Sequence, residues 1–118
     1  MPLIRVYTSA SVPEAVRMQV LLSSLSSTLA HELGKRESDI MTVLHADARM
    51  TFAGTDAPAC YAELKNVGNQ LSPALTARLS NVLCRLLSDA LELPTSRIYI
   101  EFCNVAPHHW GWDGTTFA

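Results

Sequence analysis

Residues 71–93 read LSPALTARLSNVLCRLLSDALEL, and their apolar residues recur at spacings of three and four. Such spacing places an apolar stripe along one face of an α-helix. Ser72 and Pro73 are typical of a helix start, since serine caps the first turn and proline is tolerated at its first position. The predicted stripe consists of Leu75, Leu79, Val82, Leu83, Leu86 and Leu87.

Strands are predicted on both sides of this helix, in CYAELKNV (residues 60–67) and in SRIYIEFCNV (96–105). The first half of the chain repeats this order of elements. A strand is expected over residues 3–8, and a second strand is expected in DIMTVLHA (39–46). Between them lies a second helical pattern, whose apolar stripe consists of Met18, Leu21, Leu22, Leu25, Leu29 and Leu33.

The ends of this first helix carry their own signals. Ser11 and Glu14 have the spacing of a capping box, and Pro13 suits the first turn. Gly34 is the expected C-cap, because glycine adopts the left-handed conformation without strain. We therefore predict a helix that begins in SVPEAV (residues 11–16) and ends at Gly34.

An offset of 58 residues relates the two halves: it overlays Asp39-Ile40 on Arg97-Ile98, and Ile4 on Ala62. Each half is a βαβ unit, and such crossovers are almost always right-handed. Two of them predict a two-layer α+β fold, in which a four-stranded mixed sheet carries both helices on one face. Residues 1–118 are expected to form a single domain.

Alternation along the strands predicts which side chains face the helices. The other face of the sheet mixes apolar, aromatic and charged residues, so it suits neither bulk water nor a dry core. A closed symmetric oligomer would cover it around a wet centre. The helix-facing set consists of Ile4, Val6, Ile40, Leu44, Ala62, Leu64, Ile98, Ile100 and Phe102.

Composition excludes several classes of protein. The 118 residues are 48% hydrophobic and 17% charged, which argues against disorder, and a net charge of −2 without a basic patch argues against nucleic-acid binding. The apolar runs are too short to span a bilayer, and no signal-peptide pattern is present, so we expect a cytoplasmic protein. Three cysteines without metal-ligand spacing, and the adjacent His108 and His109, predict no metal site; no cofactor is expected.

Pro2 directly follows the initiator methionine. A proline is tolerated as the first residue of a strand, where it need not donate to the ladder. If Met1 is removed, however, Pro2 becomes a terminal secondary amine that its ring holds in one direction. Both interpretations, a strand-start residue and a catalytic base, are open from this residue alone.

Five motifs together resemble the macrophage migration inhibitory factor (MIF) family of the tautomerase superfamily, including its microbial members, and the resemblance covers essentially the whole chain. It implies the tautomerase/MIF fold and a homotrimer. It also implies keto–enol tautomerisation of aromatic 2-oxo acids such as phenylpyruvate, and of dopachrome derivatives. The motifs are MPLIRV (1–6), SVPEAV (11–16), LGKRESDI (33–40), NVGNQLSP (66–73) and GWDGTTFA (111–118).

The resemblance also implies residue roles. Pro2 matches the family's catalytic base, and Lys35 matches the lysine that binds the substrate carboxylate. Val67 matches a position whose backbone contacts substrate, and Tyr99 a pocket tyrosine that the neighbouring subunit contributes. For Lys35 the spacing alone favours a solvated cation at a helix C-terminus, and only the resemblance favours the binding role. Tyr99 would also suit an interface residue.

Aromatic residues near the carboxyl terminus complete the implied pocket. Trp112 and Phe117 match the family's aromatic wall, which would stack on the substrate ring. Two positions depart from the animal proteins. Glu101 replaces an asparagine that touches substrate, and Trp110 replaces a small aliphatic residue and should narrow the pocket mouth.

The chemistry requires a base whose pKa lies near the working pH. An ordinary secondary amine is too basic, but an apolar pocket and the nearby Lys35 ammonium both disfavour its cationic form. Two alternatives stay open at this point. One is a secreted, cytokine-like ligand of a receptor, and the other is a dehalogenase or decarboxylase of the same fold, in which Arg5 and Glu101 would assist Pro2.

Overall fold

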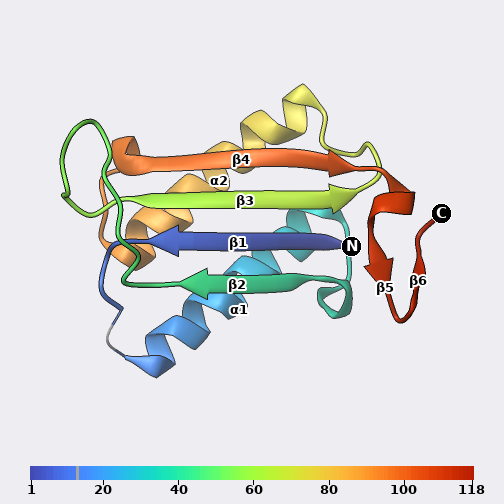
Figure 1. The fold of residues 1–118 in the computed structure, drawn as a ribbon, viewed down its shortest axis with the longest axis horizontal. Helices are drawn as coiled ribbons and strands as arrows, with labels where there is room; N and C mark the ends of the chain where they lie inside the picture. Colours follow the sequence, from blue (N-terminus) through green and yellow to red (C-terminus); the bar gives the residue numbers. More distant parts are fainter. Residues whose placement is uncertain (13) are drawn as a thin grey trace.

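A computed structural model describes residues 1–12 and 14–118. Three short 3₁₀ turns, η1 (Glu37–Asp39), η2 (Thr95–Arg97) and η3 (Pro107–His109), connect its longer elements. Figure 1 shows the arrangement, in which the amino terminus and the carboxyl-terminal hairpin lie at the same end of the sheet. The helices and strands are β1 (Pro2–Thr8), α1 (Ala15–Leu33), β2 (Met41–His45), β3 (Cys60–Val67), α2 (Pro73–Leu91), β4 (Ile98–Val105), β5 (Gly111–Trp112) and β6 (Thr115–Thr116).

The four long strands form one mixed sheet in the order β2-β1-β3-β4. β1 pairs with β2 and β3 pairs with β4 in parallel, while β1 and β3 are antiparallel at the centre. Each half of the chain is thus a βαβ unit, and the two units join through the β1–β3 pair. The predicted fold class is confirmed.

The internal repeat is confirmed almost residue by residue. The offset of 58 maps α1 onto α2 and η1 onto η2, with identical bounds. It also maps the C-cap Gly34 (φ 64°) onto Glu92 (φ 55°), and both residues are in the left-handed conformation. Leu25 and Leu83 are equivalent positions, and both are fully buried.

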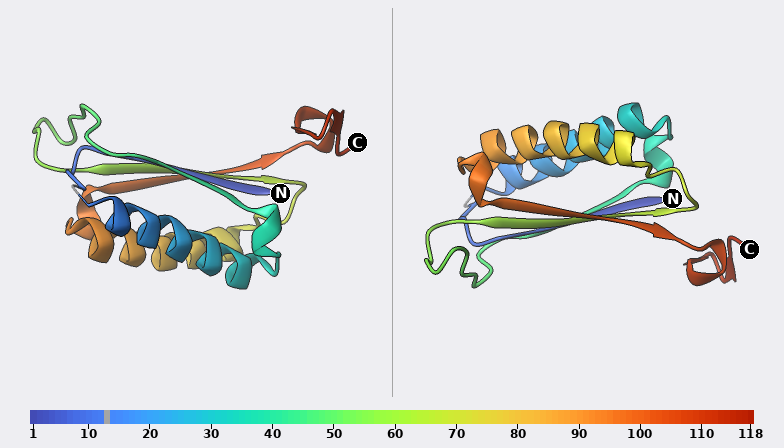
Figure 2. Two further views of the ribbon diagram at one scale, coloured as in Figure 1. Left: turned by 90° about the horizontal axis from the view of Figure 1, so that it is seen from below. Right: turned by 90° about the horizontal axis from the view of Figure 1, so that it is seen from above.

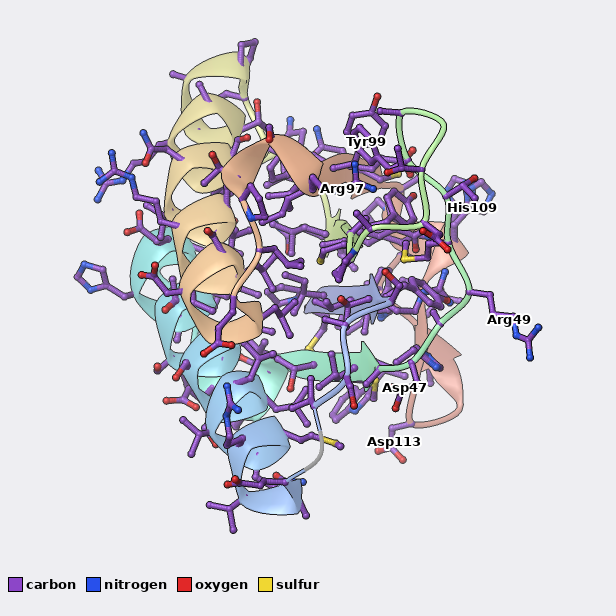
Figure 3. The ribbon with its side chains drawn as sticks, turned by 90° about the vertical axis from the view of Figure 1, so that its left-hand side faces the viewer. Asp47, Arg49, Arg97, Tyr99, His109 and Asp113 are labelled. Carbon is purple, nitrogen blue, oxygen red and sulfur yellow. The ribbon has the colours of Figure 1, made fainter. Side chains whose placement is uncertain are left out.

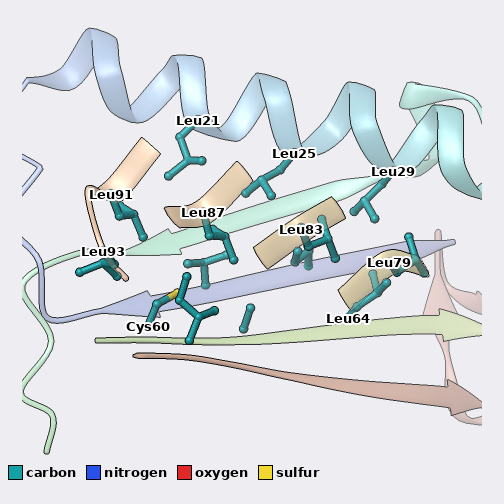
Figure 4. Packing of buried hydrophobic residues seen from close by; sticks show 14 of the residues in the cluster. Leu21, Leu25, Leu29, Cys60, Leu64, Leu79, Leu83, Leu87, Leu91 and Leu93 are labelled. Carbon is teal, nitrogen blue, oxygen red and sulfur yellow. The ribbon is translucent and has the colours of Figure 1, made fainter. Parts of the chain in front are cut away.

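Both helices cover one face of the sheet and leave the other uncovered in the single chain (Figure 2). Figure 4 shows the leucines of the two helices packed between the helices and the strands. The predicted stripes supply most of this core, and the helix-facing strand residues complete it as expected. The helix residues that are buried are Leu21, Leu25, Leu29 and Leu33 of α1 and Leu79, Leu83, Leu87 and Leu91 of α2.

The predicted capping box of α1 is wrong. The helix begins at Ala15, and Glu14 is the residue that precedes it and makes no side-chain capping bond. Val12, which follows Ser11, is buried in the core before the helix begins. Ser11 therefore lies too far from the first helical turn to cap it. Pro13, predicted in the first turn, lies outside the described residues. By contrast, Ser72 does cap α2, and its side chain accepts a hydrogen bond from the Leu75 N–H.

The carboxyl-terminal hairpin was not predicted as strands. β5 and β6 are joined by Asp113 and Gly114, which both have positive φ values of 50° and 81°. This is the conformation of a type I′ turn, for which Asp-Gly is a favoured pair. The hairpin projects beyond the end of the sheet, on the side away from the helices (Figure 2). Within the described part of the chain, no helix combines the length and apolar character needed to cross a membrane.

The unequal capping of the two helices gives a stability prediction. Ser72→Ala should lower the free energy of unfolding by about 0.5–2 kcal/mol, because the Leu75 N–H loses its acceptor. Glu14→Ala, at the equivalent position before α1, should change it by less than about 0.5 kcal/mol. Urea unfolding followed by circular dichroism measures both, and equal losses would contradict the capping difference.

Candidate active site

Pro2 begins β1 at the end of the sheet where the two termini meet, and it is buried. It lies opposite Asn66 in the antiparallel β1–β3 ladder. The Ser9 N–H donates to the Ala59 carbonyl at 3.1 Å, which fixes which pairs of this ladder exchange hydrogen bonds. Because such pairs alternate, Pro2 and Asn66 form a non-hydrogen-bonded pair. Proline therefore loses no ladder hydrogen bond to β3.

The same alternation gives the direction of the Pro2 nitrogen. The Thr8 carbonyl accepts from the Ala48 N–H at 2.9 Å, on the β2 side of β1. Backbone groups of alternate residues point the same way along a strand, so the Pro2 nitrogen also faces the β2 side. At this end of the sheet that side holds the segment between α1 and β2.

This segment begins where Gly34 ends α1. The left-handed Gly34 turns the chain, and the Lys35 N–H donates to the Ala30 carbonyl at 3.0 Å. Lys35 then lines a cavity of about 340 Å³. Its other lining residues are Met1, Arg36, Asp39, Trp112 and Phe117.

The aromatic wall of this cavity comes from the carboxyl-terminal tail. The Phe117 N–H lies within hydrogen-bond distance of the carbonyls of Pro107 and Trp110, at 3.2 and 3.3 Å, and so folds the tail back on itself. The rings of Trp112 and Phe117 then stack, with centroids 6.3 Å apart and an interplanar angle of 17°. Trp112 stays 59% exposed and Phe117 39% exposed, so both rings are open to a ligand.

Electrostatics at the cavity disfavour a positive charge on the chain terminus. Partial burial lowers the pKa of the Met1 α-amino group, the Lys35 ammonium lowers it further, and the Asp39 carboxylate opposes both. Asp39 also pairs with the Arg36 guanidinium, Nε to Oδ2, at 3.2 Å. An amine placed here is therefore less basic than one in water.

The single chain brings together four of the residues singled out from the sequence. Pro2, Lys35, Trp112 and Phe117 meet at one end of the sheet. Val67 lies at the same end, since it follows Asn66 in β3. Trp110 belongs to the same tail but does not line the cavity.

Tyr99 and Glu101 are not part of this cluster within one chain. Tyr99 lies at the opposite end of the sheet, beside the loop that connects β2 and β3, as Figure 3 shows. It is 64% exposed and packs on Phe52, with ring centroids 4.7 Å apart. Glu101 lies opposite Glu63 near the middle of the sheet. A role for either residue in the cavity that Lys35 lines would need a second copy of the chain.

Arg5 also lies outside this cluster, because its guanidinium pairs with Glu63. Its Nη2 lies 2.6 Å from Glu63 Oε2, on the face of the sheet away from the helices. Hydrogen bonding from Arg5 lowers the pKa of Glu63, while desolvation, together with the Tyr61–Glu63 hydrogen bond, raises the pKa of Tyr61 to about 12. Arg5 is thus held in a local network and does not assist Pro2 in the single chain.

Sequence reasoning missed four polar residues of this region. Arg36 and Asp39 line the cavity, and their place beside Lys35 in LGKRESDI was the available signal. Asn66 and Gln70 link the strand opposite Pro2 to the end of α1. No signal in the pattern identified that link, because it joins segments distant in the sequence.

Comparisons with known proteins agree with the motif resemblance. The family model described as "Macrophage migration inhibitory factor (MIF)" matches residues 1–118. The macrophage migration inhibitory factor of Mus musculus is 36% identical over 121 residues, which cover 100% of both chains. A homologue from Trichuris trichiura is 33% identical over 92% of this chain and 95% of its own.

Solved structures show the same similarity. The crystal structure of a macrophage migration inhibitory factor homologue from Prochlorococcus marinus superposes with a TM-score of 0.90 at 40% identity, over 98% of this chain and 99% of that one. The corresponding protein of Trichinella spiralis gives a TM-score of 0.86 at 28% identity, over 98% and 99% of the two chains.

The charges at the cavity predict opposite shifts of one titration. In protein that retains Met1, Lys35→Met should raise the pKa of the α-amino group, because a repelling cation is lost, and Asp39→Asn should lower it. Arg49→Met, a distant exposed cation at the other end of the sheet (Figure 3), is the control and should leave it unchanged. An NMR titration of selectively labelled Met1 measures all three; identical curves would refute this account of the cavity.

Proposed function

Because this chain belongs to the macrophage migration inhibitory factor family of the tautomerase superfamily, we propose that it is an isomerase. It interconverts the keto and enol forms of aromatic 2-oxo acids of the phenylpyruvate type, and it also accepts dopachrome derivatives. The observation that carries this proposal is the cavity beside the start of β1. It combines a chain terminus of lowered basicity, a lysine and two stacked aromatic rings. These groups suit a flat aromatic acid.

Pro2 is the general base in this proposal, once Met1 has been removed. Its nitrogen faces the side of β1 that holds Lys35, and the burial and charge that act on the Met1 amine would act on a proline amine there. The neutral amine takes a proton from the carbon next to the substrate carbonyl. The carbonyl oxygen takes a proton from water, so that the enol forms, and the hydroxide that is left takes the proton from the proline ammonium. The neutral base is thus restored, and the reverse sequence converts the enol to the keto acid.

Lys35 binds the substrate carboxylate, and its charge also keeps the proline amine neutral at a lower pH. Trp112 and Phe117 hold the substrate ring against their exposed faces. The backbone at Val67 contacts the substrate. Within the family a cytokine-like role is the alternative, and the cavity favours the enzyme because a receptor ligand needs no such pocket.

The remaining site residues contribute to the pocket when three copies of the chain form a homotrimer. The uncovered face of the sheet, with its aromatic and charged side chains, is buried between subunits, and Tyr99 of one subunit reaches the pocket of its neighbour. Trp110 narrows the mouth of the pocket, and Glu101 changes its charge relative to the animal proteins. We place the enzyme in the cytoplasm.

A homotrimer should be the only species in sedimentation equilibrium at micromolar concentration, since each 12.9 kDa chain exposes one face of its sheet. If the trimer delivers Tyr99, Tyr99→Phe should change the kinetics of phenylpyruvate tautomerisation without changing the sedimentation mass. A stable monomer that retained full activity would contradict the trimer.

The role of the Pro2 nitrogen is tested without changing any side chain. Two preparations, one that retains Met1 and one that lacks it, are verified by mass spectrometry and assayed with phenylpyruvate. Retention makes the amine an amide, so the rate should fall about 10²–10⁴-fold, the usual contribution of a positioned base. The melting temperature is the control and should stay nearly constant. Equal rates would leave Pro2 as a strand-start residue only.

A further inference from the structure

Two amide side chains connect the strand opposite Pro2 with the end of the helix that precedes Lys35. The Asn66 Nδ2 donates to Gln70 Oε1 at 3.1 Å, and the Gln70 Nε2 donates to the Leu33 carbonyl at 2.8 Å. Asn66 is fully buried. Leu33 is the last residue of α1, and its carbonyl has no partner within the helix.

The direction of this chain of hydrogen bonds is fixed by its end. The Leu33 carbonyl only accepts, so Gln70 must turn its NH₂ group towards it and its oxygen towards Asn66. Asn66 must then present its own NH₂ group. Among the described residues its Oδ1 is buried without a hydrogen-bond partner, as expected where the link to Leu33 decides the orientation of both amides.

The internal repeat allows this hydrogen-bonded link to be compared with the equivalent positions of the other half. At the other end of the sheet, the equivalents of Asn66 and Gln70 are Thr8 and Val12. The Thr8 hydroxyl bonds only nearby backbone, the Ala59 carbonyl at 2.8 Å and the Ala10 N–H at 3.1 Å. Val12 is apolar and buried, so it cannot bond the end of α2.

The residue equivalent to Lys35 at that other end is also apolar: it is Leu93, buried in the core. The amide link is therefore found at the one end of the duplicated fold that carries a lysine, and both are missing from their equivalent positions at the other. We infer that Asn66 and Gln70 are positioning residues, which hold the end of α1 against β3 so that Lys35 faces the cavity beside the start of β1.

This inference rests on the proposed function for its kinetic consequence, but one measurement does not need activity. Lys35 lowers the pKa of the Met1 α-amino group in protein that retains Met1. Gln70→Met keeps the length of the side chain and removes its donor to Leu33. It should raise this pKa part of the way towards the value of Lys35→Met, and it should add nothing in the Lys35→Met background.

The kinetic arm uses Met1-free protein and phenylpyruvate. Gln70→Met should raise KM about three- to tenfold with little change in kcat, which is the factor that one net hydrogen bond is worth. In the Lys35→Met background the same change should alter KM less than about twofold, because the residue that Gln70 positions is absent.

A matched control separates positioning from general loss of structure. The Asn104 amide also bonds backbone in this region, since it accepts from the Leu71 N–H at 3.1 Å and donates to the Leu71 carbonyl at 3.3 Å. It does not reach α1, so Asn104→Leu should lower the melting temperature without changing the α-amino pKa or KM. If Gln70→Met does not fold, Gln70→Leu removes the same donor without adding a charge.

The outcomes distinguish the two proposals. An α-amino pKa in Gln70→Met equal to that of the wild type, or an equal rise with and without Lys35, would overturn the inference whatever the enzyme does. Absence of phenylpyruvate turnover in Met1-free wild-type protein, with the predicted shifts of the α-amino pKa present, would overturn the proposed function and leave the positioning role standing.

Discussion

The register between β1 and β3 is the constraint on which the rest of this structure depends. It joins the two βαβ halves, and it pairs Arg5 with Glu63, which are equivalent residues of the internal repeat. The pseudo-twofold axis of the fold therefore passes between them, and there opposite charges form an ion pair at 2.6 Å. A slip of one residue would send every side chain of β1 to the other face of the sheet. It would also move Pro2 into a hydrogen-bonded pair, where its nitrogen has no hydrogen to donate to the ladder.

Given this register, three distant segments meet at one end of the sheet: the amino terminus, the turn after α1 and the carboxyl-terminal hairpin. The opposite end has the same order of elements because of the internal repeat, but a different segment of the chain covers it. The connection between β2 and β3 occupies the place of the hairpin there, and Arg97 fixes it by donating to the carbonyls of Phe52, Ala57 and Pro58. At one end of the duplication a loop is therefore held by Arg97, and at the other the cavity is lined by the charged side chains of Lys35, Arg36 and Asp39.

The sequence was sufficient for those parts of the fold that repeat with a short period. Helix stripes and strand alternation predicted the core and both layers, and Gly34 correctly marked the end of α1. The cap of α1 was missed because burial of Val12, a tertiary contact, decides where the chain enters the helix. β5 and β6 were missed because strands of two residues have no periodicity. The bond from Gln70 to the Leu33 carbonyl joins residues 37 apart in the sequence, and no local pattern predicts it.

The cavity also explains why the structure keeps a residue, Asn66, that lowers its stability. The unpartnered Asn66 Oδ1 is a buried acceptor, and such a group typically costs about 1–3 kcal/mol. A leucine at this position would avoid that cost, and the equivalent Thr8 shows that the fold accepts a fully satisfied polar residue in the same environment. Since stability alone does not favour asparagine here, the position of this residue is explained by what its amide holds. Through Gln70 it holds the end of α1, and with it Lys35, whose charge lowers the pKa of the chain-terminal amine.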